Sequence, residues 1–195
     1  MRLPALAFTT CLLLGCAQTK IQNTWRAPQD PPKKIQKFAV FAVTGSPSGR
    51  IAYEDTLTQR LKDAGLPALP GYDIVTYDEH PGRDEVIQRL KAKQIDGALV
   101  TRIDSRNVKT ESTPVWVTTG VPGPYFYDYY SAVAVGTYTT EESEAVVETV
   151  LFSLEDGRPY WMARTFTKRT DPNKFAKDIA PTVASSLKES GLFAP

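Results

Sequence analysis

One stretch of the chain constrains its fold more than any other: the continuous apolar run from Phe38 to Val43. Lys37 precedes this run, and the turn-forming residues Thr44-Gly45-Ser46-Pro47 follow it. A short apolar run without polar alternation is typical of a strand that is covered on both faces. The run therefore predicts the interior of an α/β layer.

Two helices and two further strands are expected between this run and Ile103. The apolar positions of the helices are Ile51, Tyr53, Leu57, Leu61 and Ala64 for the first, and Val86, Ile87, Leu90 and Ile95 for the second. The extended segment from Ala68 to Tyr77 contains Pro70 and Gly71, which place it at a sheet edge. Gly97 to Ile103 is the other strand. Alternating strands and helices imply right-handed crossovers.

The second half of the chain predicts a β-hairpin and a final helix. Extended runs flank Asp156-Gly157, which is a strong hairpin signal. The last helix starts near Pro172, and Pro181 is expected to kink or split it. The expected fold class is α/β (α+β), with a single mixed sheet, two crossover helices, a β-hairpin and a C-terminal helix packed on the sheet. One domain is expected over residues 35–195.

The N-terminus predicts export from the cytoplasm. Arg2 precedes an apolar core from Leu3 to Leu14, which is too short to span a bilayer and is typical of a secretory signal peptide. The residues Leu13-Leu14-Gly15-Cys16 resemble the lipobox of bacterial lipoproteins. This resemblance implies that residues 1–15 are removed, that the Cys16 sulfur receives a diacylglycerol and that the new amino terminus is acylated, with palmitate as an expected chain. An ordinary signal with an incidental cysteine is the alternative.

Acyl chains on Cys16 would anchor the protein to a membrane without threading it through. Ala17 follows the cysteine, and resemblance to the sorting pattern of enteric lipoproteins favours the outer membrane, with the protein facing the periplasm. Retention at the inner membrane is the alternative. Residues 16–34 are polar and contain prolines, which predicts a flexible tether with a relaxed length of about 25 Å. Trp25 is an anomaly in such a tether, and we expect it to dock on the domain rather than to sit at the membrane interface.

Composition excludes several classes of function. Removal of the signal peptide takes away Arg2 and no acidic residue, so the formal net charge falls from +1 to zero. A chain without excess positive charge is not expected to bind nucleic acid. Cys11 is removed and Cys16 is lipidated, so the folded part has no thiol for a disulfide, a metal site or a nucleophile. The chain also lacks a phosphate loop and a dinucleotide fingerprint, and we expect no cofactor.

Several short segments, in order along almost the whole mature chain, carry a resemblance to a known group. They are Thr24-Trp25-Arg26-Ala27-Pro28, the Phe38 to Val43 run, Arg50 with Tyr53-Glu54-Asp55, Gly65, Gly97 to Arg102, the aromatic loop described below, and Asp156-Gly157 with Trp161. With these segments the chain resembles bacterial lipoproteins of unknown function. More loosely, it resembles the α/β domains of outer-membrane activators of peptidoglycan synthases and the N-terminal domain of the translocation protein TolB. The closer group implies no catalytic residues.

Candidate catalytic and metal-binding residues are few. His80 is the only histidine, and an exposed loop residue before proline is a better interpretation of it than a catalytic base. The sequence around Ser46 and Ser48 is the nearest approach to the nucleophile elbow of a serine hydrolase, but Pro47 occupies the position where that motif needs its serine. The acidic residues around His80 have two interpretations, a weak cation site or a solvated turn at the start of a helix. We favour the turn, because the residues do not have the spacing of a calcium-binding loop or of a zinc site. The acids concerned are Asp78, Glu79, Asp84 and Glu85.

Two other sets of charged residues are better explained by structure or solvent exposure than by a functional site. Arg50 and Glu54 are spaced to pair along one helix turn, so we expect a structural pair rather than a site. Glu141, Glu142 and Glu144 resemble glycosidase carboxylates, but no partner acid can be placed opposite them. No catalytic and no metal-binding residue is therefore assigned.

The loop from Pro114 to about Ser131 is the best candidate for binding, with packing against the sheet as the alternative. It contains Trp116, Tyr125, Phe126, Tyr127, Tyr129 and Tyr130 among Gly and Pro. Aromatic side chains of this kind are frequent where proteins contact proteins or sugars. We therefore expect a non-enzymatic binding or adaptor module of the cell envelope, which contacts an envelope protein or peptidoglycan through this loop and the Ala68 to Tyr77 edge. A cell-wall glycan hydrolase and a structural subunit of an envelope oligomer are the alternatives.

Overall fold

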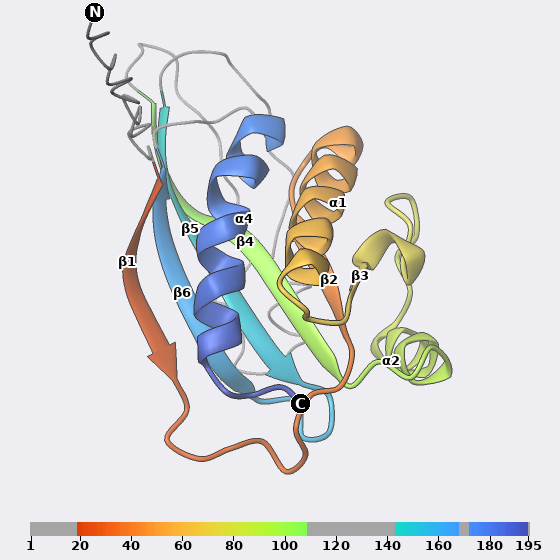
Figure 1. Cartoon of the computed structure of the whole chain (residues 1–195). Helices are drawn as coiled ribbons and strands as arrows, with labels where there is room; N and C mark the ends of the chain where they lie inside the picture. Colours follow the sequence, from red (N-terminus) through yellow and green to blue (C-terminus); the bar gives the residue numbers. More distant parts are fainter. Residues whose placement is uncertain (1–18, 109–142, 168–171, 195) are drawn as a thin grey trace, which may run out of the picture.

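The computed structural model describes residues 19–108, 143–167 and 172–194. It contains one mixed six-stranded sheet with the strand order β1-β6-β5-β4-β2-β3, and helices packed on it (Figure 1). The strands are β1 (Thr19–Arg26), β2 (Phe38–Val43), β3 (Ala68–Pro70), β4 (Gly97–Val108), β5 (Ser143–Ser153) and β6 (Pro159–Thr167). The helices are α1 (Pro47–Asp63), the short 3-10 helix η1 (Gly71–Asp73), α2 (Arg83–Ala92) and α4 (Pro172–Glu189). The predicted fold class is confirmed.

The strands divide into a parallel part and an antiparallel part. β2 lies parallel to both β3 and β4, and the crossovers between these strands carry α1 and α2. Each strand of the series β4, β5, β6 and β1 is antiparallel to its neighbour. The predicted hairpin is present between β5 and β6, and Gly157 in its turn has a φ of 72°, which favours glycine.

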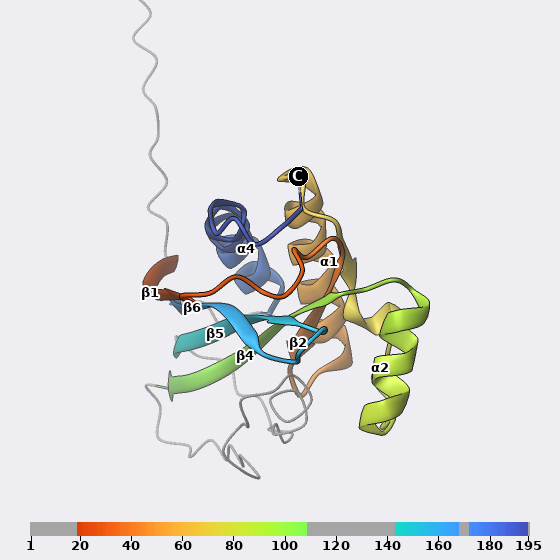
Figure 2. The same ribbon diagram turned by 90° about the horizontal axis from the view of Figure 1, so that it is seen from below.

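Helices cover the two faces of the sheet unequally (Figure 2). α1 and α4 pack on one face with the buried side chains of Leu57, Leu61, Ile179 and Val183. On the other face, the buried apolar cluster that includes α2 extends, among the described residues, from β2 to β5. β2 contributes to both clusters, as its continuous apolar run predicted.

Part of the segment over residues 16–34, which is predicted to be a flexible tether, is a strand of the sheet. Thr19–Arg26 forms the edge strand β1, which pairs antiparallel with β6. The end of β1 and the loop that follows it also bind the turn after α4, because Arg26 Nε donates to the Ser190 carbonyl at 2.8 Å and Lys34 Nζ donates to the Gly191 carbonyl at 2.6 Å. The polar sequence of β1 does not by itself indicate a strand, because the strand depends on its pairing with the edge of β6.

Two smaller expectations also change. The edge segment expected over Ala68 to Tyr77 is a strand only as far as Pro70, and η1 begins at Gly71. β3 does lie at the edge of the sheet, as predicted. Of the two outcomes expected at Pro181, a kink or a split, the split is absent, because α4 is one continuous helix. In the part of the chain that the structure describes, none of the helices has the length and apolar character needed to cross a bilayer.

Candidate functional site

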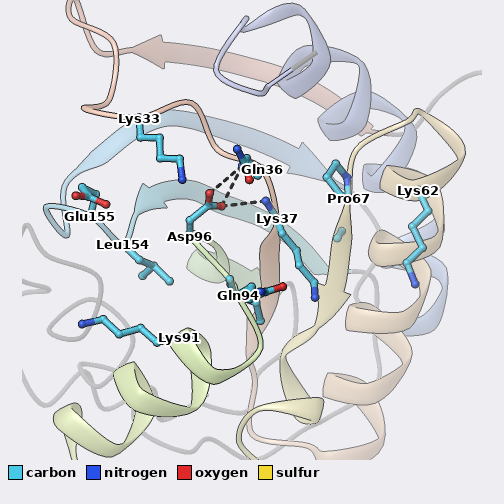
Figure 3. Close-up of a pocket in the computed structure, with 12 residues that line it drawn as sticks. Lys33, Gln36, Lys37, Lys62, Pro67, Lys91, Gln94, Asp96, Leu154 and Glu155 are labelled. Carbon is cyan, nitrogen blue, oxygen red and sulfur yellow. Dashed lines mark hydrogen bonds between the residues drawn. The ribbon is translucent and has the colours of Figure 1, made fainter.

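An open groove lies where β2, β3 and β4 begin, and lysine side chains surround it (Figure 3). Its volume is about 770 Å³. Lysines come from four separate segments: Lys33 from the loop after β1, Lys37 from the start of β2, Lys62 from α1 and Lys91 from α2. A second hollow of about 590 Å³ shares the lining residues Gln36, Lys62 and Pro67 with the first.

Asp96 organises the floor of this lysine groove. Its carboxylate accepts the backbone N–H of Gln36 at 3.0 Å and that of Lys37 at 2.9 Å (Figure 3). In return, the backbone N–H of Asp96 donates to the Lys37 carbonyl at 2.9 Å. The residue before β4 is therefore tied to the residues before β2, which fixes the backbone from which Lys37 extends.

The turn between α2 and β4 shapes the adjoining wall. Gln94 has a φ of 55°, in the left-handed region, and its N–H donates to the Lys91 carbonyl at 2.9 Å. Ile95 N–H then donates to the Leu90 carbonyl at 3.0 Å, which ends the helix. This cap satisfies carbonyl groups at the end of α2 and places Lys91 on the rim of the groove.

The groove carries an excess of positive side chains. Four lysines line it, against the two acids Asp96 and Glu155. Lys62 and Lys91 also lie in the last turns of α1 and α2, where a cation is favourable next to the negative end of the helix dipole. The helix ends offset part of the positive charge, and the exposed ammonium groups of Lys33, Lys62 and Lys91 remain available to an acidic partner.

The groove and the start of β1 lie at opposite ends of the sheet. Thr19 pairs with Thr167, which pairs with Ala145, and Ala145 pairs with Arg106 near the far end of β4. Gly97, next to the groove, starts that same strand, so about 30 Å of sheet separates the groove from Thr19. Val108 and Ser143, which bracket the aromatic loop in the sequence, pair at the Thr19 end.

The other concentration of charge is buried and belongs to the core. Arg50 and Glu54 form an ion pair of 2.8 Å along α1, as predicted, and both side chains are buried. Arg50 also donates to the Val75 carbonyl at 2.7 Å. Burial raises the pKa of Glu54, and the nearby Arg50 charge opposes that rise. The pair joins α1 to the segment after η1, and neither residue lines the two hollows described above, which agrees with a structural role.

Of the acids around His80, Glu79 and Glu85 have structural partners, and Glu85 accepts an Arg89 hydrogen bond at 2.7 Å. Glu79 accepts the Thr76 backbone N–H at 2.9 Å and an Arg89 hydrogen bond at 2.8 Å. The Arg89 guanidinium lowers the pKa of Glu79 to about 2. His80 is exposed, as expected. Within the described ranges, no group of three or more His, Cys, Asp or Glu side chains is placed to hold a metal ion.

Ser46, one of the two serines beside Pro47, has a local role. It is the N-cap of α1, and its hydroxyl accepts the Gly49 backbone N–H at 3.2 Å. An N-cap hydroxyl satisfies one of the free N–H groups of the first turn. Ser48 lies 3.1 Å from it, oxygen to oxygen.

The residues singled out for anchoring and binding lie outside the described residues. These are Cys16 and the aromatic side chains of Trp116, Tyr125, Phe126, Tyr127, Tyr129 and Tyr130. Glu141 and Glu142 also lie outside them, and the described part does not include the side chain of Glu144. Their proposed roles stay predictions.

Sequence reasoning did not find the lysine groove. Its residues come from positions 33 to 155, and no spacing rule connects the four lysines. Taken alone, Lys33, Lys62 and Lys91 are ordinary exposed residues, and the half-buried Lys37 donates to the Lys93 carbonyl at 2.9 Å. Only the parallel pairing of β2, β3 and β4 brings them to one end of the sheet.

Comparisons with known proteins found distant likenesses. No protein family model matches the chain, and the search of curated proteins found no match. Among solved structures, the chain is similar to the PelC dodecamer from Paraburkholderia phytofirmans, with 15% identity and a TM-score of 0.48, covering 87% of this chain and 97% of the other. It is also similar to lipoprotein GNA1162 from Neisseria meningitidis, with 12% identity and a TM-score of 0.39, covering 79% and 99%. The looser resemblance to synthase activators and TolB stays a prediction.

Proposed function

We propose that this protein is a bacterial lipoprotein that is anchored through Cys16 and works as a non-enzymatic binding or adaptor module of the cell envelope. We place it at the outer membrane, facing the periplasm. In this proposal the lysine groove holds acidic groups of an envelope protein or of peptidoglycan. The observation that carries the proposal is the groove itself, in which four lysines surround an open hollow.

The chemistry of the groove favours binding over turnover. Lysine ammonium groups on long stems are point charges that adapt to an acidic partner, and they lack the planar fork with which arginine fixes one carboxylate or phosphate. Asp96, the acid on the floor, is engaged by backbone N–H groups of Gln36 and Lys37. That engagement makes it a structural group and a poor general base.

In-cell photo-crosslinking tests the proposal. A photoreactive residue in place of Gln36, which is exposed and lines the groove, should capture a specific partner in cells that export the full chain. The Lys62→Glu/Lys91→Glu variant should reduce that capture about tenfold, because two attractions become repulsions. Lys177→Glu, an exposed charge reversal on α4 away from the groove, is the matched control and should leave capture unchanged.

Other readouts separate the partners and the alternatives. Co-sedimentation of the full chain with isolated sacculi, weakened by the same double variant, would identify peptidoglycan. A protein in the crosslinked product would identify an envelope protein. Release of soluble glycan from the sacculi would contradict a non-enzymatic module, and equal capture by the groove variant and the Lys177→Glu control would contradict the groove.

The aromatic loop is proposed as a second contact surface. Replacing Trp116, Tyr125 and Tyr127 with alanine should abolish partner capture while the circular dichroism of the folded chain is retained, because large amphipathic side chains dominate binding surfaces. Unchanged capture would exclude this loop and leave the lysine groove as the proposed contact.

A further inference from the structure

We propose that the sheet face that carries Lys20 and Trp25 rests on a phospholipid surface. This inference rests on the proposed lipid anchor at Cys16 and deepens it, because it names a protein surface that meets the membrane. The exposed edge of the sheet, β1, carries both residues. The partner is a bilayer that contains anionic headgroups.

The first step is proximity. Thr19, the first residue of β1, is three residues from Cys16, so at most about 11 Å of extended chain separates the lipid-bearing residue from the sheet. Thr19 is held in place because its hydroxyl donates to that of Thr167 at 3.2 Å. With the expected tether replaced by a paired strand, β1 lies close to the lipid headgroups.

The second step is the direction of the side chains. On β1, Lys20 pairs with Phe166 and Trp25 pairs with Met162. Met162 packs against the buried cluster that includes α2, whereas Trp161 and Ala163 point to the face covered by α1 and α4. Lys20 and Trp25 therefore point to the face of β1 and β6 opposite these two helices.

The third step is the composition of that face. Trp25 exposes 42% of its surface, and Ile51 is the other exposed large hydrophobic residue in the described part of the chain. On that face, β1 and β6 carry the cationic residues Lys20 and Arg164 and no Asp or Glu, whereas Arg26 points to the other face and donates to the Ser190 carbonyl. Exposed indole rings and long cationic side chains are both favoured at a membrane interface, where the ring lies at headgroup level and the cation reaches the lipid phosphates.

A single exposed tryptophan is in itself unremarkable on a protein surface. Here it lies on the strand that follows the anchor, on an acid-free pair of strands, beside the half-buried Met162 and on the same face as Lys20. Trp25 is six residues beyond Thr19, about 20 Å along the strand. Contact of both Lys20 and Trp25 with lipid therefore requires β1 to lie along the membrane surface, which is a definite orientation.

Quenching by brominated lipids tests this orientation in the full lipidated chain. The vesicles contain phosphatidylglycerol and phosphatidylethanolamine with brominated acyl chains, and each protein variant retains one of the three tryptophans. The Trp116→Phe/Trp161→Phe variant, which retains Trp25, should be quenched several-fold more than Trp25→Phe/Trp116→Phe, which retains Trp161. Trp161 is buried in the core and is the matched control. Equally weak quenching of both variants would overturn the inference.

A second measurement leaves every tryptophan in place. Once Cys16 is lipidated, the mature chain has no free thiol. A polarity-sensitive dye can therefore be attached to the single cysteine of the Asn23→Cys variant or of the Thr24→Cys variant. Asn23 pairs with Arg164 on the proposed membrane face, and Thr24 pairs with Ala163 on the opposite face. A blue shift on vesicles for Asn23→Cys alone supports the inference, and equal shifts overturn it. Mass spectrometry of the N-terminal peptide separately tests the lipid on Cys16, so failure of the anchor and failure of the orientation are distinguishable.

Discussion

Arg50 donates its Nε hydrogen to Glu54 Oε1 across 2.8 Å inside the core, where Glu54 has no exposed surface. The same carboxylate accepts the backbone N–H of Ala42 at 2.9 Å and that of Tyr72 at 2.7 Å. One ion pair thus connects α1 with β2 and with the start of η1. Because all its partners are internal, it contributes to the shape of the domain.

Replacing Arg50 with methionine should lower the free energy of unfolding by about 3–5 kcal/mol. The substitution keeps the length of the side chain but leaves the Glu54 carboxylate buried without its counter-charge, and it leaves the Val75 carbonyl without its donor. Urea unfolding followed by circular dichroism measures the loss. Stability should recover partly in Arg50→Met/Glu54→Gln, which removes the buried charge. A double variant no more stable than Arg50→Met would contradict the electrostatic explanation.

The floor of the lysine groove gives a second prediction. Asp96→Ala removes the acceptor for the backbone N–H groups of Gln36 and Lys37, and it should lower the free energy of unfolding by about 1–2 kcal/mol. The same change should speed amide hydrogen exchange at Gln36 and Lys37, which mass spectrometry or NMR can follow. Exchange as slow as in the unmodified chain would show that other contacts hold this segment.

Acid conditions should weaken the contacts of Glu79. Its pKa in the folded state is about 2, below that of an exposed glutamate, because Arg89 and the Thr76 N–H bind the charged form. A group with a lowered pKa contributes stability above its unfolded pKa, near 4.3, and loses that contribution as the pH falls toward 2. Glu79→Gln should therefore flatten the dependence of the urea midpoint on pH between about 4.5 and 2. An unchanged slope would contradict the assignment.

The interior of the fold could be predicted from the sequence because its signals are local. The run from Phe38 to Val43 is buried on both faces, and Asp156-Gly157 turns the hairpin as its sequence indicates. α1 and α2 form where their apolar spacing indicates, although Ile51 is exposed and not on the buried face of α1. In each of these cases the residues that decide the structure are within a few positions of each other.

The edges and the groove could not be predicted, because distant residues decide them. Thr19–Arg26 has neither apolar alternation nor a turn signal, and its pairing with β6 involves residues about 140 positions away. Trp25, expected to dock on the domain, is exposed on that strand. The lysine groove forms only when Lys33, Lys62 and Lys91 are brought together by the parallel strands.

Gly71 should not tolerate even a methyl group. A Cβ added there would lie 2.5 Å from Phe41 Cδ1 and 2.7 Å from the Val40 carbonyl oxygen, so β2 or η1 would have to shift. Gly71→Ala should lower the free energy of unfolding by about 1–3 kcal/mol, measured by urea unfolding. Gly82→Ala is the control for the added methyl group, since a Cβ there meets nothing within 4 Å; because Gly82 is the N-cap of α2, its loss should stay below about 1 kcal/mol. Equal losses would rule out crowding as the cause.

Pro181 offers a way to stabilise the domain. It lies inside the continuous helix α4, where its nitrogen cannot donate to the Lys177 carbonyl, and it is exposed. Pro181→Ala should restore that hydrogen bond and raise the free energy of unfolding by up to about 3 kcal/mol. Pro172→Ala is the control, because proline is favourable at the first position of a helix and its loss should bring no gain. A Pro181→Ala variant with unchanged stability would show that the packing of α4 on α1 already absorbs the strain of the missing bond.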